Sequence, residues 1–358
     1  MKNLTLFFLS VLSLSVAADN DQNQQESTNI LEQKTQAEVL SFEPPVYPSR
    51  ARNMGIEGWV VTRFVVTAEG GVENVEIVES SIEDYFDYAA IKSAKTRKFR
   101  PATSMGKPVI QANTQVRSIF TFSNSDGGVG KKFLRSYKKA SKLINEDKLD
   151  QAKELIDKLD QNERRILAEV CYLDMLKAQY FAKAGDKEET LKYVERALVI
   201  ADTVATQPIF VNLLRQAIVD NALANRFQKS IEHYQTLADI DKDLAPDDPI
   251  HGYMTQIHNI LDGDKSILTK GDIAIRCKTC TDPGPSWRHT LNRNQFSIDS
   301  VQGELSNMKI SCENSLVSIA YETDMTWTVN RDGGECDIRV IGTEGTTFRL
   351  IELPNRNS

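Results

Sequence analysis

The chain of 358 residues is long enough for two or three hydrophobic cores, because single domains usually contain about 100–200 residues. Its hydrophobic fraction of 41% and charged fraction of 26% are typical of globular proteins. The formal net charge of −7 argues against a general nucleic-acid binder, which would carry a basic stripe, and against docking on anionic lipid by charge alone.

The N-terminus has the pattern of a secretory signal peptide. Lys2 precedes an apolar run over residues 4–16, and Ala17-Ala18 supplies the small residues that a signal peptidase recognises. A transmembrane helix needs roughly 20 apolar residues, so this run is short for a membrane span. We therefore interpret residues 1–18 as a signal peptide that is cleaved on export; an uncleaved inner-membrane anchor is the alternative.

A pattern of short elements follows a Gln-rich stretch. Residues 19–40 are polar and are expected to form a flexible leader, and the prolines between residues 44 and 48 then impose extended backbone. Apolar periodicity over residues 41–123 predicts a compact αββαβ domain. Its expected elements are a helical turn over 49–54, strands over 58–67 and 72–78 joined at Gly70-Gly71, a helix over 84–98 and a long strand over 109–122.

The rest of the chain changes character twice. Residues 131–262 carry Leu, Ala and Tyr at helical spacing in sets about 38–40 residues apart, and this pattern resembles degenerate tetratricopeptide (TPR-like) helical repeats of undetermined type. Residues 268–353 alternate short β-like runs with turns, which predicts a small antiparallel sandwich or barrel. The expected fold class is therefore α+β, with an αββαβ domain, an all-α repeat region and an all-β domain in that order.

The five cysteines divide into one outlier, Cys171, and a C-terminal group, Cys277, Cys280, Cys312 and Cys336. In an oxidising compartment this arrangement indicates two structural disulfides and one buried thiol. Four cysteines allow three connectivities, and the sequence does not choose among them. A zinc site or a redox-active pair at Cys277 and Cys280 is an alternative.

No pattern of catalytic residues is found. The chain lacks a nucleophile elbow, a phosphate-binding Gly-rich loop and a His-Glu-x-x-His sequence. Its four histidines, at positions 233, 251, 258 and 289, lack the neighbouring ligands of a metal set and are interpreted as surface residues. We therefore expect a protein that is not an enzyme and has no catalytic site, metal or cofactor.

Residues 45–109 carry an ordered series of motifs. The series begins at Pro45-Val46-Tyr47-Pro48 with Ala51, Gly55 and Gly58, and continues through Phe64, Val66-Thr67 and Asn74-Val75, Phe86-Asp87 with Ala89-Ala90, and Lys98-Phe99-Arg100-Pro101-Ala102 with Gly106 and Pro108-Val109. This series resembles the C-terminal domain of the TonB family of energy transducers.

The resemblance implies a periplasmic domain that contacts TonB-dependent receptors of the outer membrane. In the family, a receptor segment adds as a strand to an exposed sheet edge, where unpaired backbone groups bind it. Carried over to this chain, the partner-binding residues would be Tyr47, Pro48, Gln115, Val116, Arg117, Ser118, Ile119, Phe120, Thr121 and Phe122. Arg117 would pair with an acidic residue of the peptide.

The N-terminal region departs from the family pattern. A TonB transducer has a histidine-bearing membrane anchor and a Pro-rich spacer, whereas the apolar run here has no histidine and residues 19–40 contain no proline. A peptide of about 25 residues is also too short to cross the periplasm. We therefore expect this protein either to borrow force from an inner-membrane ExbB/ExbD-type motor through another transducer or to use the fold only for binding.

Two hypotheses follow. In the first, the protein binds envelope partners and supports TonB-dependent uptake of siderophores or vitamins. In the second, it is a structural scaffold of the cell envelope that binds proteins or peptidoglycan through its repeats and β domain, with the TonB-like domain mediating a homodimer.

Overall fold

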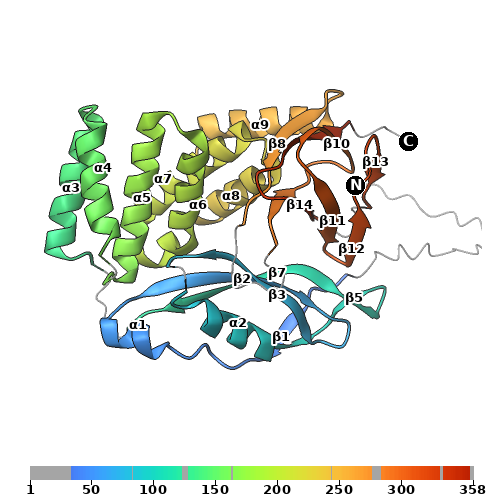
Figure 1. Ribbon diagram of the computed structural model, residues 1–358, viewed down its shortest axis with the longest axis horizontal. Helices are drawn as coiled ribbons and strands as arrows, with labels where there is room; N and C mark the ends of the chain where they lie inside the picture. The colour runs from blue at the N-terminus through green and yellow to red at the C-terminus, as the bar shows by residue number, and fades with distance from the viewer. Residues whose placement is uncertain are drawn as a thin grey trace, which may run out of the picture.

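The computed structural model describes residues 34–82, 84–122, 128–162, 164–242, 244–275, 284–330 and 334–354. They form an N-terminal α/β domain, a helical region and a C-terminal β domain, in that order along the chain (Figure 1). The helical region and the β domain both lie over the sheet of the N-terminal domain. The α+β class and the order of the three parts expected from the sequence are therefore confirmed.

The N-terminal domain is built on an antiparallel sheet with the strand order β3-β2-β7. Val60 of β2 lies opposite Ser80 of β3 and Ser118 of β7. The helices α1 and α2 cover one face of this sheet (Figure 1). The elements are β1 (Glu38–Ser41), α1 (Ser49–Met54), β2 (Gly58–Val66), β3 (Val72–Ser80), α2 (Asp87–Thr96), β4 (Lys98–Arg100), β5 (Ala102–Ser104), β6 (Lys107–Val109) and β7 (Gln111–Phe120).

The turn between β2 and β3 requires a glycine at position 70. Gly70 has a φ of +80°, and a Cβ atom there would lie 2.0 Å from the carbonyl oxygen of Phe99. Phe99 also donates its N–H to the carbonyl oxygen of Gly70 at 2.9 Å. A residue with a side chain would be strained and would clash, so this hairpin turn forms where the glycine pair predicts it.

The structure differs from the expected flexible leader at the leader's C-terminal end. Residues 38–41 form β1, which pairs antiparallel with β4. Thr35 and Thr103 also exchange backbone hydrogen bonds of 2.9 and 3.0 Å. Because these backbone groups are satisfied by a segment about sixty residues away, the polar composition of the stretch alone gives no sign of these hydrogen bonds. Residues 1–33, with the proposed signal peptide and most of the leader, lie outside the described residues.

The helices of the middle region form one layered array, in which each helix from α3 to α8 packs against the next and α9 packs against α7 (Figure 1). Ala140, Ala152 and Ala197 are completely buried within the helix clusters, which explains the alanine periodicity of the sequence. Cys171 is a free, buried thiol, and burial raises its pKa to about 12, so it is unreactive. The helices are α3 (Lys131–Asn145), α4 (Leu149–Asp160), α5 (Leu167–Ala184), α6 (Lys187–Val204), α7 (Gln207–Leu223), α8 (Phe227–Ile240) and α9 (Pro249–Asp262).

The β domain contains two four-stranded antiparallel sheets, with the orders β13-β10-β15-β8 and β12-β11-β14-β9. Apolar side chains from both sheets form one core, which includes Phe296 and Phe348 from one sheet and Met308 and Ile338 from the other. The strands are β8 (Ile267–Asp272), β9 (Ser286–Thr290), β10 (Gln295–Gln302), β11 (Leu305–Cys312), β12 (Ser315–Ala320), β13 (Thr326–Thr328), β14 (Cys336–Gly342) and β15 (Thr347–Leu353).

The interpretation of the histidines as surface residues is wrong for His289. This residue is buried, and its Nε2 atom lies 2.9 Å from Oε1 of Glu352, which is also buried. Glu352 further accepts backbone hydrogen bonds from Asn292 and Arg293 at 2.5 and 2.8 Å. The carboxylate therefore organises the turn between β9 and β10 from inside the domain.

Candidate partner-binding site

Tyr47 and Pro48 lie on the side of the sheet that α1 and α2 cover. The hydroxyl of Tyr47 donates to the carbonyl oxygen of Ile56 at 2.5 Å, and its ring contacts Phe86 and Phe120 edge-on at 5.9 and 5.8 Å between centroids. Burial, followed by the charge of a neighbouring glutamate, raises the pKa of Tyr47 to about 12. Pro48 stands immediately before α1. Tyr47 therefore contributes mainly to the packing of this domain.

Strand β7 ends the sheet, since it pairs with β2 and no other described strand lies beyond it. Gln115, Arg117 and Thr121 are exposed, whereas Val116, Ile119 and Phe122 are partly buried and Ser118 and Phe120 are buried. The ring of Phe122 stacks on Tyr47 at 5.0 Å between centroids. The predicted edge is thus present, but only part of it faces solvent.

Arg117 already has a carboxylate partner within the chain. Its guanidinium donates two hydrogen bonds, of 2.7 and 3.0 Å, to Asp202 of α6, and a further one to the carbonyl oxygen of Val199. Although burial opposes the effect, these hydrogen bonds lower the pKa of Asp202. An acidic peptide would have to compete with Asp202 for Arg117.

The second face of the sheet packs against the helical region. Trp59 of β2 is completely buried there, and Val61 and Ile119 contribute partly buried side chains. The opposing apolar side chains come from α5, α6 and α7, and they are Leu167, Val170, Cys171, Ala197, Ile200, Ala201 and Leu213. Both faces of this end of the sheet are therefore covered.

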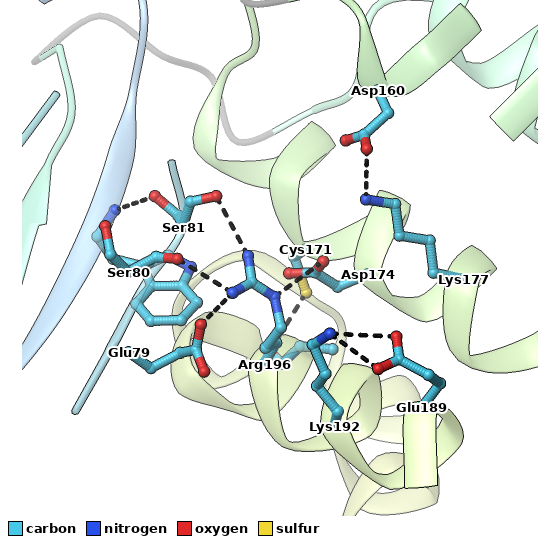
Figure 2. Close-up of polar contacts among 12 residues, drawn as sticks. Glu79, Ser80, Ser81, Asp160, Cys171, Asp174, Lys177, Glu189, Lys192 and Arg196 are labelled. Carbon is cyan, nitrogen blue, oxygen red and sulfur yellow. Dashed lines mark hydrogen bonds and ion pairs between the residues drawn. The ribbon is translucent and has the colours of Figure 1, made fainter. Parts of the chain in front are cut away.

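Figure 2 shows Arg196 of α6 between this sheet and the helices. Its guanidinium donates to the Glu79 carboxylate and to the carbonyl oxygens of Ser80 and Ser81 at 3.0 and 3.2 Å. Its Nε lies 3.4 Å from Oδ1 of Asp174, a buried carboxylate of α5. Arg196 therefore fixes the end of β3 to two helices.

Glu57 fixes a second junction. It is 1% exposed, and its carboxylate accepts hydrogen bonds from the hydroxyl of Thr121 at 3.0 Å and from the backbone N–H groups of Phe122 and Leu167, both at 2.8 Å. A negative charge at the first residue of α5 also complements the helix dipole. Neither Glu57 nor Arg196 can be recognised from the sequence, because nothing in the local pattern distinguishes them from solvent-facing charges.

The β domain contacts the opposite end of the sheet. Arg63 of β2 lies 3.3 Å from Asp337 of β14, and Ala112 of β7 donates its N–H to the carbonyl oxygen of Glu313 at 2.8 Å. Two cavities, of about 540 and 810 Å³, open between the parts and are both bordered by Arg63. The smaller one is lined by residues 111–115 of β7, so that part of the strand borders a space large enough for a ligand.

Of the predicted disulfide cysteines, Cys312 and Cys336 are bonded to each other, at the end of β11 and the start of β14. Cys277 and Cys280 lie outside the described residues. Within the described ranges, no three histidine, cysteine or carboxylate side chains come together as a metal site. In the same part of the chain, no helix is long and apolar enough to span a membrane.

Comparison with known proteins identifies the N-terminal domain. Residues 43–122 match the family model for the C-terminal domain of the Gram-negative bacterial TonB protein. Protein TonB of Pseudomonas aeruginosa is 34% identical over 77 residues, which are 22% of each chain. Protein TonB of Escherichia coli is also 34% identical, over 70 residues that make up 20% of this chain and 28% of that protein. The chain therefore spans about a quarter of the length of these relatives.

One solved structure is also similar to part of this chain. The solution structure of the Pseudomonas aeruginosa TonB C-terminal domain is 28% identical and aligns with 25% of this chain and 91% of its own, with a TM-score of 0.23. The motif series, the family model and the curated relatives agree on the same residues. Residues 43–122 of this chain are therefore a TonB C-terminal domain, to which the helical region and the β domain are joined.

Proposed function

We propose that this chain is a non-enzymatic periplasmic protein that binds envelope partners by strand addition to β7 and thereby supports TonB-dependent transport across the outer membrane. The observation that carries the proposal is the TonB C-terminal domain at residues 43–122 with β7 at the end of its sheet. Outer-membrane receptors for siderophores or vitamins are the expected partners. Force from an ExbB/ExbD-type motor would reach this protein through another transducer.

The geometry favours the first half of β7 as the binding segment. Arg117 is held by Asp202, and Ser118 and Phe120 are buried, so the second half offers few groups to a partner. Gln115 is exposed and borders the 540 Å³ cavity together with the preceding four residues. An extended peptide entering this cavity would meet the edge of β7 without displacing the helices, and it would compete with Glu313 for the backbone N–H of Ala112.

Site-specific photo-cross-linking in the producing cells tests this proposal. A photoreactive residue at position 115 is expected to form an adduct with an outer-membrane receptor. The same residue at Tyr88, which is 79% exposed on α2, serves as the control and is expected to form none. If neither position, or only position 88, captures a receptor, strand addition at β7 is wrong.

The contacts that join the N-terminal domain to the helical region and to the β domain also favour a second candidate function, a structural scaffold of the cell envelope. Arg196 and Glu57 join the TonB C-terminal domain to the helices, and Arg63 joins it to the β domain. A scaffold would bind proteins or peptidoglycan through the helical region and the β domain. Deleting the gene would then weaken the envelope without changing the uptake of siderophores or vitamins.

A further inference from the structure

The first helix of the helical region carries its positive charge on one face. Helix α3 contains lysine or arginine at six positions and no carboxylate, in a chain whose formal net charge is −7. At about 100° per residue, the six side chains fall within an arc of roughly 120° around the helix axis. We call this set the α3 cation face, and its members are Lys131, Lys132, Arg135, Lys138, Lys139 and Lys142.

The α3 cation face points to solvent. All six of its residues are exposed, whereas Phe133, Ala140 and Ile144, on the opposite side of the helix, are buried in the core of the helical region. Helix α3 packs against α4 and α5, and Figure 1 shows it at the end of the array that is farthest from the β domain. A large, flat partner can therefore reach this face without displacing any element.

The cations of this face are not neutralised within the chain. Among the described residues, five of the six have no hydrogen-bond or ion-pair partner. The sixth, Lys142, lies 3.7 Å from Glu146, and its side chain is still 77% exposed. The adjacent helix α4 carries both signs of charge, and its Lys153 pairs with Asp157 at 2.8 Å. The local excess of positive charge is thus confined to α3 and is available to a partner.

This arrangement lowers the intrinsic stability of the helix. Lys131 and Lys132 lie in the first turn, which contains no acidic residue and where the helix dipole disfavours positive charge. Arg135 lies four residues from both Lys131 and Lys139, and like charges at this spacing repel each other. A helix that served only for packing would be more stable with carboxylates at some of these positions, so the charge indicates a role beyond packing.

The face lacks the features by which a specific protein partner is recognised. In the described part of the chain, none of the exposed large apolar side chains belongs to α3. Neither of the two cavities described above is lined by a residue of α3. Specific protein interfaces depend on apolar or aromatic anchors that become buried in pockets. An anionic lipid surface requires no anchor, because each lysine or arginine near the headgroups contributes separately to binding.

The negative charge of the rest of the chain does not cancel this local excess. At 0.1 M salt, the interaction between exposed charges is screened over about 10 Å. The carboxylates of the β domain lie at the opposite end of the molecule from α3 (Figure 1). The net charge of −7 argues against lipid binding only as an average over the whole chain, and the structure separates α3 from much of that charge.

We propose that the α3 cation face docks on an anionic phospholipid membrane surface, with α3 lying along the membrane and the rest of the helical array directed away from it. The charge complementarity between unpaired cations and anionic headgroups selects this occupant. The contact uses neither β7 nor any other part of the TonB C-terminal domain. It therefore holds or fails independently of the proposed function.

Co-sedimentation of the full chain with phospholipid vesicles tests the proposal. The chain is expected to bind vesicles of phosphatidylcholine that contain about 30% phosphatidylglycerol at least tenfold more tightly than vesicles of phosphatidylcholine alone. Each cation near the surface strengthens binding about fivefold, so changing Arg135, Lys138 and Lys139 together to glutamine should weaken binding to the anionic vesicles about a hundredfold. Circular dichroism should show an unchanged helix content in this triple variant, because the changes relieve repulsion between exposed side chains.

A matched control separates the face from the net charge of the chain. It changes three exposed lysines on β6, α6 and β8 to glutamine, which are Lys107, Lys187 and Lys270. The control variant has the same net charge as the triple variant of α3 and should bind the anionic vesicles within about threefold of the unchanged chain. An equal loss of binding in both variants, or no loss in the α3 variant, would overturn the proposal.

Lysine acetylation followed by mass spectrometry tests the same contact in the unmodified protein. Lys138 and Lys139 should react several-fold more slowly when anionic vesicles are present, whereas Lys107 and Lys270 should react at an unchanged rate. Equal protection of both pairs would contradict docking through α3. Binding to polyglutamate but not to the vesicles would also overturn the proposal, and would assign the face to an acidic protein segment.

Discussion

Replacing Arg196 by methionine is expected to destabilise the junction between the TonB C-terminal domain and the helices. Methionine retains an apolar stem beside Trp59, whose ring centre lies 5.5 Å from the guanidinium carbon. It removes every hydrogen bond that the guanidinium donates to β3 and to Asp174. The change therefore isolates the polar contribution of Arg196.

The magnitude follows from burial. The side chains of Arg196 and Asp174 are only 14% and 5% exposed. Removing one member of a buried ion pair costs about 3–5 kcal/mol, because the remaining charge keeps its desolvation penalty. We therefore expect Arg196→Met to lower the free energy of unfolding by about 3–5 kcal/mol.

Urea denaturation followed by tryptophan fluorescence and far-UV circular dichroism measures this change. Lys192→Met is the matched control on the same helix, since Lys192 is 47% exposed and pairs with Glu189, and it should cost less than about 1 kcal/mol. Adding Asp174→Asn to Arg196→Met should recover part of the loss, because the uncompensated charge is gone.

The pH dependence gives the result that would refute this reasoning. Burial raises the pKa of Asp174, with Arg196 opposing, and the loss of Arg196 should raise it further. When the pKa of a carboxyl group is higher in the folded state than in the unfolded state, its ionisation lowers the stability of the fold. This loss is complete above the folded-state pKa and disappears as the pH falls below the unfolded-state pKa. If Arg196→Met lowers the free energy of unfolding by less than about 1 kcal/mol, or if this loss does not shrink towards pH 4, Asp174 is not an uncompensated charge in the variant.

Two other predictions concern the β domain. Burial and the neighbouring Glu232 raise the pKa of Glu335 to about 7, with Lys229 opposing, so ionisation of Glu335 costs stability as the pH rises from 4.5 to about 7. Glu335→Gln should therefore raise the Tm near pH 8 and leave the Tm unchanged near pH 4. An equal change of Tm at both pH values would contradict the raised pKa of Glu335. The disulfide between Cys312 and Cys336 closes a loop with a sequence separation of 24, which predicts a loss of about 3.5 kcal/mol when both cysteines are replaced by alanine. Equilibrium unfolding that is unchanged in this double variant would show that the loop is already ordered without the bond.

The sequence predicts those elements whose signals are local. The glycine pair at the β2–β3 turn and the alternating apolar residues of β2 each specify structure within a few residues, and the structure has these elements. Strand β1 was missed because its partner β4 is remote and because its four residues, of which Val39 and Leu40 are apolar, end a polar stretch. Strand β9 has a weak local signal, because it follows a Pro-rich segment of the sequence and mixes buried and charged residues.

The candidate site shows the same division. The motif series led to β7, but local pattern could not reveal that Asp202 holds Arg117 or that α5–α7 cover Trp59. Those contacts join residues more than eighty positions apart, and a buried arginine such as Arg196 has the same helical spacing as an exposed one. Only the tertiary arrangement distinguishes them.

The covered face of the sheet has a consequence for how this protein can be dissected. A fragment limited to residues 43–122 would expose Trp59, Val61 and Ile119, which α5–α7 bury in the whole chain. It would also lose the hydrogen bond between Glu57 and Leu167 that orders the start of α5. Nonspecific binding or dimerisation of such a fragment would result from the apolar surface that is buried in the whole chain. Binding partners are therefore best sought with the intact chain.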